Sequence, residues 1–176
     1  MKIIAVAVVS ANGKLTDGNN PHISKWTSKE DSRFFRSQIL GSNLIVMGSG
    51  TYEVERDLIH PDEKHLRIVL TKNPDKYLQN KIPGQLEFSD EEIFLLVQTL
   101  EKRGYSEMLL VGGSEIYSAF LSANLIDEFY LTIEPFIFGS GKALFKEEDF
   151  SSKLELLEIK SLNKTGTILL KYKVKK

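Results

Sequence analysis

The chain has 176 residues, a formal net charge of −1, and 41% hydrophobic and 27% charged residues. This length and composition predict one globular domain over residues 1–176. The absence of cysteine excludes disulfides, thiol nucleophiles and cysteine–zinc sites, and no metal site is expected. The only basic block, Lys171–Lys176, alternates like a strand, so nucleic acid and membranes are not expected partners. These features favour a cytoplasmic protein.

Short apolar runs alternate with helical patterns along most of the chain. Strands are predicted at 2–9, 43–47, 66–71 and 107–111, and helices at 28–40, 51–57, 90–103 and 114–122. Ser89–Glu92 has the pattern of a capping box for the third helix. The last third predicts strands at 127–134, 154–162 and 166–174, the last two joined by a turn at 163–166. The order predicts an α/β fold with a mainly parallel sheet, flanking helices and an antiparallel C-terminal hairpin.

Two predicted strands end in glycine turns that lead directly into helices. Gly112 and Gly113 follow the strand at 107–111, and Gly48 and Gly50 follow the strand at 43–47. Glycine allows close approach of a backbone to a phosphate, and a helix N-terminus offers free N–H groups. Two such junctions could hold a dinucleotide pyrophosphate, with Thr51 as a hydroxyl donor. A tight turn is an equally good interpretation of Gly112–Gly113 alone, and neither junction is a GxGxxG motif or a P-loop.

A third strand end carries a hydroxyl and a cation, Thr71 and Lys72, before Pro74. This pair could receive the 2′-phosphate of an adenosine, or it could form a solvated turn that proline ends.

An acidic residue occupies the aromatic side of the helix at 28–40. Thr27 or Ser28 can cap this helix, and Asp31 shares a face with Phe34 and Phe35. A carboxylate there is costly unless it is paired or has a function. The alternative is a first-turn Asp that complements the helix dipole.

The order and spacing of several short segments resemble the dihydrofolate reductase-like superfamily, and within it the riboflavin-pathway reductase domain that forms the C-terminal part of bifunctional deaminase-reductases. The segments are Ser10–Leu15, Trp26–Phe35, Val46–Glu53, Leu70–Pro74, Val111–Tyr117 and Leu131–Ile133. Pro135–Phe145 is similar to the riboflavin branch, whereas Asp31 is similar to the pterin-binding acid of dihydrofolate reductases.

The resemblance implies an NADPH-dependent hydride transfer. It implies a catalytic pair, Asp31 and Thr132, in a substrate pocket beside Trp26, Phe34 and Phe35. Burial among these aromatic rings should raise the pKa of Asp31. The implied cofactor contacts are Gly48, Ser49, Gly50, Thr51, Thr71, Lys72, Gly112, Gly113, Ser114, Glu115, Ile116 and, near the nicotinamide, Tyr117.

The resemblance also has conformational implications. The Gly112–Gly113 peptide should be cis, and the loop from Ala11 to Lys25 should close over the nicotinamide. Ser49 departs from dihydrofolate reductases, which usually have an arginine there for the 2′-phosphate.

Three functions stay open. One is a reductase of a ribosylaminopyrimidine phosphate, without the deaminase half because no HxE or PCxxC zinc signature is present. Its phosphate would need a cation, for which Arg33, Arg36 and Lys142 are candidates. The second is a dihydropterin reductase, favoured by Asp31 and Thr132. The third is a protein that binds nucleotide or pterin without turnover. Whether the chain forms a homodimer is also open.

Overall fold

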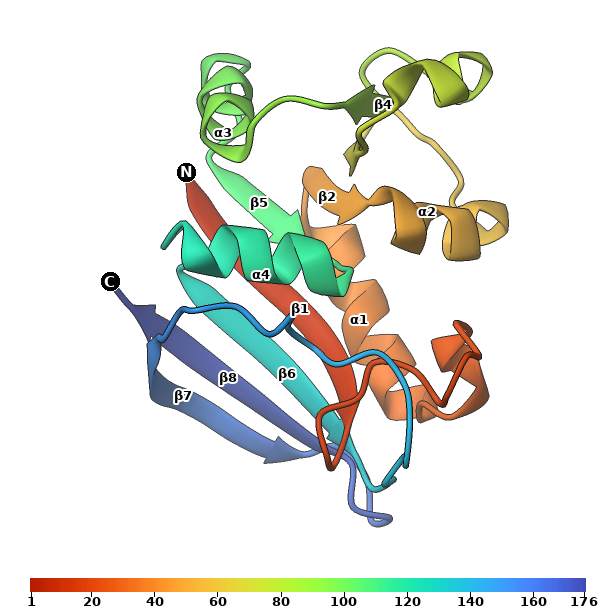
Figure 1. Ribbon diagram of the computed structural model, residues 1–176, viewed down its shortest axis with the longest axis vertical. Helices are drawn as coiled ribbons and strands as arrows, with labels where there is room; N and C mark the ends of the chain where they lie inside the picture. Colours follow the sequence, from red (N-terminus) through yellow and green to blue (C-terminus); the bar gives the residue numbers. More distant parts are fainter.

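An eight-stranded sheet of order β4-β3-β2-β5-β1-β6-β8-β7 forms the centre of the computed structural model, which describes all of residues 1–176 (Figure 1). The strands are β1 Lys2–Ser10, β2 Leu44–Gly48, β3 Leu66–Leu70, β4 Leu86–Ser89, β5 Glu107–Leu110, β6 Glu128–Glu134, β7 Lys153–Ser161 and β8 Ile168–Lys175. The helices are α1 Lys29–Gly41, α2 Ser49–Glu55, α3 Ile93–Lys102 and α4 Ser114–Ser122. Short 3-10 turns occur at Ile23–Lys25, Arg56–Leu58 and Pro74–Asn80.

The strands from β4 to β6 run parallel, and β8 and β7 complete the sheet as an antiparallel hairpin. This arrangement confirms the predicted α/β fold. Because parallel strands share a direction, the ends of β1, β2, β5 and β6 meet at one edge of the sheet, which we call the carboxyl edge. Ligands of open parallel sheets bind outside this edge.

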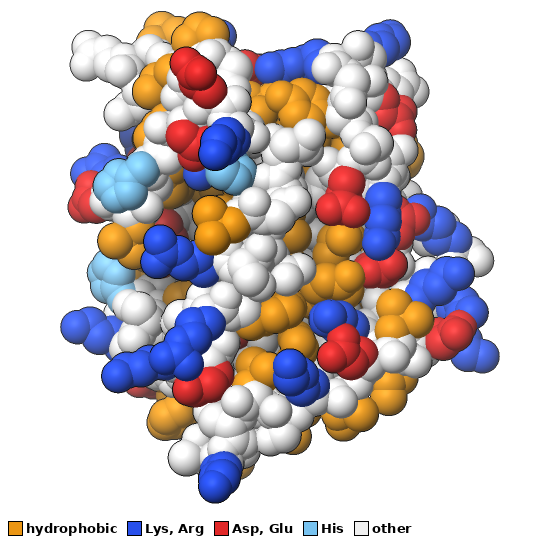
Figure 2. All heavy atoms as spheres, turned by 180° about the vertical axis from the view of Figure 1, so that it is seen from behind, with side chains coloured by type: hydrophobic (Ala, Val, Ile, Leu, Met, Phe, Trp, Pro, Cys, Tyr) orange, Lys and Arg blue, Asp and Glu red, His pale blue; other side chains and the backbone are white.

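Helices cover both faces of the sheet (Figure 1). Tyr117 and Phe120 of α4 and Leu100 of α3 pack on one face, with the odd-numbered apolar residues of β1. The other face packs against Phe34 and Phe35 of α1 and against α2. Figure 2 shows the surface of the molecule from behind, where acidic and basic side chains are intermixed and hydrophobic side chains lie between them. Burial on both faces explains the continuous apolar run of β1.

Two local predictions were wrong. The helix predicted at 90–103 begins at Ile93, and its cap is Glu92, whose carboxylate accepts from Phe94 N at 3.0 Å. Ser89 does not cap it, because the Ser89 hydroxyl accepts from Glu91 N at 3.1 Å. Strand β4 was not predicted, since it has only four residues and lacks an apolar run.

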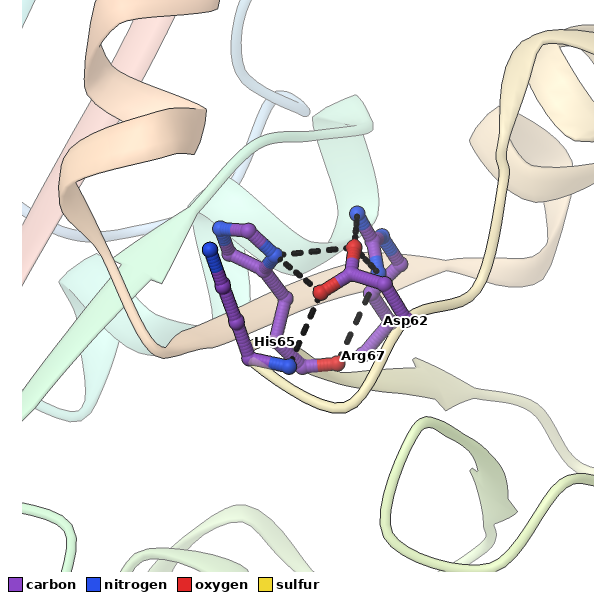
Figure 3. Close-up of polar contacts among 4 residues, drawn as sticks. Asp62, His65 and Arg67 are labelled. Atoms are coloured by element: carbon purple, nitrogen blue, oxygen red, sulfur yellow. Dashed lines mark hydrogen bonds and ion pairs between the residues drawn. The ribbon is translucent and has the colours of Figure 1, made fainter.

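A polar cluster fixes the turn before β3, at the opposite edge of the sheet, which we call the amino edge (Figure 3). The Asp62 carboxylate accepts from His65 Nδ1 at 2.7 Å, from Lys64 N at 2.9 Å and from Arg67 at 3.4 Å. Burial acts to raise the pKa of Asp62, but the His65 hydrogen bond, the Lys64 amide and the Arg67 charge lower it overall. The depression beside the cluster has no hydrophobic lining.

Strand β7 is the outermost strand of the sheet, beside β8, and it is exposed along its whole length. Its large aliphatic side chains, including Ile159 at 64% exposure, have no covering element. None of the helices combines the length and the apolar character needed to cross a bilayer.

Candidate active site

The two glycine junctions lie side by side at the carboxyl edge. The Gly48 amide donates to the Gly112 carbonyl oxygen at 2.8 Å. A Cβ atom on Gly48 would lie 2.8 Å from Cγ1 of Ile116, so a side chain there would push against the first turn of α4. Glycine at position 48 therefore permits the close packing of β2 against α4. Ile116 forms that packing contact and is half-buried.

The N-terminus of α4 is open. No side chain caps it, and the Gly113 carbonyl receives the amides of Ile116 and Tyr117 at 3.0 Å each. The amides of Ser114 and Glu115 donate to no group of the protein. They carry the partial positive charge of a helix N-terminus, which suits an anion. The Gly112–Gly113 peptide is cis, as the resemblance implied.

The N-terminus of α2 faces the same glycine pair. Helix α2 begins at Ser49, directly after Gly48, and it has no side-chain cap. The Thr51 hydroxyl would lie 3.3 Å from a Cβ atom on either Gly112 or Gly113, so it borders the pair directly. Gly50 is exposed, and a Cβ atom there would meet open space. The Thr51 hydroxyl therefore lies beside the glycine pair that leads into the open end of α4.

Cations surround the start of α4. Glu115 pairs with Lys146 at 2.9 Å, and this hydrogen bond is the main cause of its lowered pKa. The charges of Lys72 and Lys142 contribute in the same direction, which places both near Glu115. Both lysines are exposed. The structure thus brings one lysine from the segment after β3 and two from the segment after β6 near Glu115, in the first turn of α4.

The strand end beyond β3 keeps Thr71 beside Lys72. The Thr71 amide donates to the Ser89 carbonyl at 2.9 Å, and its hydroxyl accepts from Asn73 N at 3.2 Å. The hydroxyl proton is not used in these contacts, so Thr71 can still donate one hydrogen bond to a ligand.

Tyr117 lies beneath the glycine pair and faces the core. Its side chain is buried, and its hydroxyl donates to the Val6 carbonyl at 2.5 Å. Burial raises its pKa. The ring packs edge-on against Phe129. The hydroxyl is therefore already engaged, and Tyr117 supports the turn from below; a contact with the nicotinamide stays a prediction.

Asp31 is buried next to Thr132. Ser28 caps α1, since its hydroxyl accepts from Asp31 N at 3.2 Å, and only 5% of Asp31 is exposed. Burial is the main cause that raises the pKa of Asp31 to about 6; the nearby Glu134 carboxylate also raises it, and the Thr132 hydroxyl opposes the rise. The Thr132 hydroxyl is itself buried and has no hydrogen-bond partner of good geometry. A solvated Asp that only complements the helix dipole does not fit this placement.

The three aromatic residues expected around Asp31 occupy two different clusters. Phe34 packs against Tyr130 with a centroid distance of 6.4 Å, and Phe35 joins the same core. Trp26 instead packs against Phe138 at 5.2 Å, and its buried indole N–H has no partner. Trp26 thus belongs to the wall formed by the segment after β6.

Glu134 is a buried acid of this site that the sequence analysis missed. It is 2% exposed, and it accepts from Ser28 N and from the Thr167 hydroxyl, each at 2.7 Å. It lies two residues after Thr132 in β6, so both side chains point to the same face. A charged residue at an inward position of a strand could have signalled it.

The loop expected to close over the nicotinamide is tied to the segment after β6. Its hydrogen bonds to that segment include Ala11 N to Phe136 O at 2.7 Å, Leu15 N to Lys142 O at 2.7 Å and Gly18 N to Ser140 O at 3.1 Å. A Cβ atom on Gly141 would overlap the Thr16 carbonyl, so the two segments pack closely. The loop and residues 136–142 therefore form one hydrogen-bonded unit in this structure.

Comparisons with known proteins agree with this geometry. The family model of the RibD C-terminal domain matches residues 1–168. The uncharacterized protein YwjB of Bacillus subtilis is 26% identical over 162 residues, which are 88% of each chain. A pyrimidine reductase-like protein of Corynebacterium diphtheriae superposes with a TM-score of 0.82 at 18% identity, covering 99% of this chain and 92% of its own.

Dihydrofolate reductase of Enterococcus faecalis, solved with NADP(H), superposes with a TM-score of 0.68 at 21% identity, covering 99% of this chain and 97% of its own. At these identities the two solved structures show a shared fold. The match to the family model extends over nearly the whole chain, and the chain belongs to the RibD C-terminal domain family.

Proposed function

We propose that the protein is an NADPH-dependent reductase of a small heterocyclic substrate, of the type that acts in riboflavin biosynthesis on 5-amino-6-(5-phosphoribosylamino)uracil or its diamino analogue. The observation that carries this proposal is the pairing of two features at one edge of the sheet. One is a buried carboxyl, Asp31, with a pKa raised to about 6 beside the unpartnered Thr132 hydroxyl. The other is the open N-terminus of α4.

The residues at the glycine junctions fit a dinucleotide. The free amides of Ser114 and Glu115 and the Thr51 hydroxyl would hold the pyrophosphate, because they offer donors where no protein acceptor uses them. Lys72, with the Thr71 hydroxyl, would hold the 2′-phosphate of NADPH. The cofactor, when bound, supplies a hydride, which this chain's own side chains cannot do.

The chain's part in the reaction is to orient the substrate and to supply a proton. Asp31 and the Thr132 hydroxyl would offer one acid and one hydroxyl to the polar edge of a heterocycle. With a pKa of about 6, Asp31 exchanges its proton near neutral pH, as an acid–base catalyst requires. The burial that raises this pKa also keeps water from the reacting atoms.

The phosphate anchor that a ribosylaminopyrimidine phosphate needs stays a prediction. Arg33 is 76% exposed and pairs with Glu30 at 3.6 Å, and Arg36 is exposed on the same helix. Lys142 is exposed near the start of α4, where a cofactor phosphate would compete for it.

A second function, reduction of a dihydropterin, is favoured by one observation. The acid at position 31 sits on a helix against a strand hydroxyl, the pairing that the resemblance assigns to pterin recognition. Loss of NADPH absorbance, measured with the aminopyrimidine phosphate and with dihydrofolate, separates the two functions. Turnover of the first alone supports our proposal, and turnover of the second alone replaces it. Binding of NADPH without turnover of either would favour a binding protein.

A further inference from the structure

Glu134 is a buried carboxylate whose hydrogen-bond donors are all neutral. Its two oxygens accept from the Ser28 backbone amide and from the Thr167 hydroxyl, and no lysine, arginine or histidine pairs with it. Thr167 is in turn held by Asn163, whose side-chain amide donates to the Thr167 hydroxyl at 2.8 Å. A buried acid without a cation is costly, so the fold must gain something from its position.

The contact with Ser28 joins Glu134 to the first turn of α1. Ser28 is the cap of this helix, and its backbone amide donates to Glu134 while its side chain accepts from Asp31 N. One residue thus links the two acids, and displacement of Glu134 would release the end of the helix that carries Asp31. The anchor comes from β6, the strand that also carries Thr132.

The charged group that acts on Asp31 is another carboxylate, that of Glu134. From β6, the Glu134 carboxylate and the Thr132 hydroxyl act on it. On its own helix, Glu30 pairs with Arg33 at 3.6 Å and approaches Asn163, and no basic side chain forms an ion pair with Asp31. A like charge close to a carboxyl disfavours its ionised form, so the Glu134 carboxylate favours the protonated form of Asp31. The only donor that acts on the Asp31 carboxyl is the Thr132 hydroxyl, which makes no hydrogen bond of good geometry, whereas Glu134 accepts two.

We propose that Glu134 is a positioning residue of this site, which anchors the first turn of α1 through Ser28 and whose negative charge favours a proton on Asp31. The consequence for catalysis rests on the proposed reductase function. The consequence for the proton of Asp31 does not, and it can be measured in the protein without substrate or cofactor.

The test is a titration of the Asp31 carboxyl by carbon NMR in the wild type and in Glu134→Gln. Glutamine keeps the shape, its oxygen can accept from Ser28 N, and its amide can donate to the Thr167 hydroxyl. The titration midpoint of Asp31 should fall by about half a pH unit or more once the like charge is gone. Glu128→Gln, a charge removal farther back on the same strand, should leave the midpoint unchanged. An unchanged midpoint in Glu134→Gln would overturn the proposal.

A measurement on the wild type covers the case in which Glu134→Gln does not fold. The Glu134 carboxyl resonance should show an inflection at the midpoint of Asp31, and this inflection should vanish in Asp31→Asn. Its absence in the wild type would contradict the coupling between the two acids.

The activity profile then separates this inference from the proposed function. If the protein reduces its substrate, the loss of rate at high pH should move to lower pH in Glu134→Gln by the same amount as the NMR midpoint. A purely structural role would lower the rate without moving the profile, and would overturn the proposal. If no substrate is reduced, the proposed function fails, and the NMR titration still decides the role of Glu134.

Discussion

The two edges of the parallel sheet each hold an aspartate, and the pKa values of these two aspartates are shifted in opposite directions. At the amino edge, Asp62 accepts hydrogen bonds from His65, Arg67 and a backbone amide, and its pKa is lowered. At the carboxyl edge, Asp31 is more deeply buried, has no cation beside it and has a pKa raised to about 6. The same chemical group is satisfied where it holds a turn, and unsatisfied where a ligand is expected. Unsatisfied groups with shifted pKa values are typical of functional sites.

The contrast extends beyond the two aspartates. The carboxyl edge also has a buried hydroxyl without a partner, at Thr132, and a helix without a cap, at α4. Buried polar groups in folded proteins nearly always have partners. Polar groups without partners are concentrated at the carboxyl edge, which indicates that a ligand supplies the missing hydrogen bonds there.

The largest expected effect is on turnover. Asp31→Asn should lower turnover about 10²-fold or more, because it removes the acid while the shape of the side chain is kept. The dissociation constant of NADPH should barely change, since Asp31 is not among the residues proposed to hold the cofactor phosphates. Steady-state kinetics and a cofactor titration check both statements. Asp62→Asn is the matched control at the other edge, and it should lower thermal stability while turnover is retained. Equal loss of turnover in both variants would break the comparison between the edges.

Stability should depend on pH in the opposite sense at Asp31 from that at most carboxylates. The native pKa of about 6 lies above the ordinary value of 3.8, so the native state holds the extra proton between these values. Stability from this group is therefore present below about pH 4, is lost as pH rises from about 4 to about 6, and changes no further above that. Asp31→Asn should raise the free energy of unfolding by about 2–3 kcal/mol above pH 7, and this gain should disappear below about pH 4. Denaturant unfolding across this range measures it; a gain that does not change with pH would show that Asp31 is not buried as an acid.

Cofactor binding should distinguish two glycines that lie near each other. In Gly113→Ala, the new Cβ atom would lie 3.3 Å from the Thr51 hydroxyl and would narrow the space beside the open end of α4. In Gly50→Ala, the new atom would meet open space. We expect Gly113→Ala to weaken NADPH binding about tenfold or more, a loss of roughly 1.4 kcal/mol or more, and Gly50→Ala to leave it nearly unchanged. Similar affinities in the two variants would contradict the role of the open helix end in phosphate binding.

Local patterns in the sequence were sufficient for the parallel sheet and for the acid of α1. The apolar run of β1 is continuous because both faces of the strand are covered, and the helical spacing of Asp31 with Phe34 predicts that Asp31 lies on the side of α1 that faces the sheet, where it is buried. Glu134 could not be found in this way, because its partner Ser28 is 106 positions away in the chain. The contacts between the loop after β1 and residues 136–142 could not be predicted either, because these segments are also far apart in the sequence. Spacing along the chain carries no information about which distant turns meet.

The smallest expected effect concerns the choice between two cofactors. Lys72 is exposed, and it lies near Glu115 at the start of α4, where it could meet the 2′-phosphate that only NADPH carries. Lys72→Ala should weaken NADPH binding by roughly tenfold, which is the lower range for a charge-assisted contact, and should weaken NADH binding much less. Fluorescence titrations with both cofactors measure the difference, and Lys76→Ala is a control because Lys76 is already paired with Glu53 at 2.6 Å. Equal losses for the two cofactors would remove Lys72 from this role. Because Ser49 stands where dihydrofolate reductases usually have an arginine, equal affinities in the wild type would instead show that this chain has no cation directed at the 2′-phosphate.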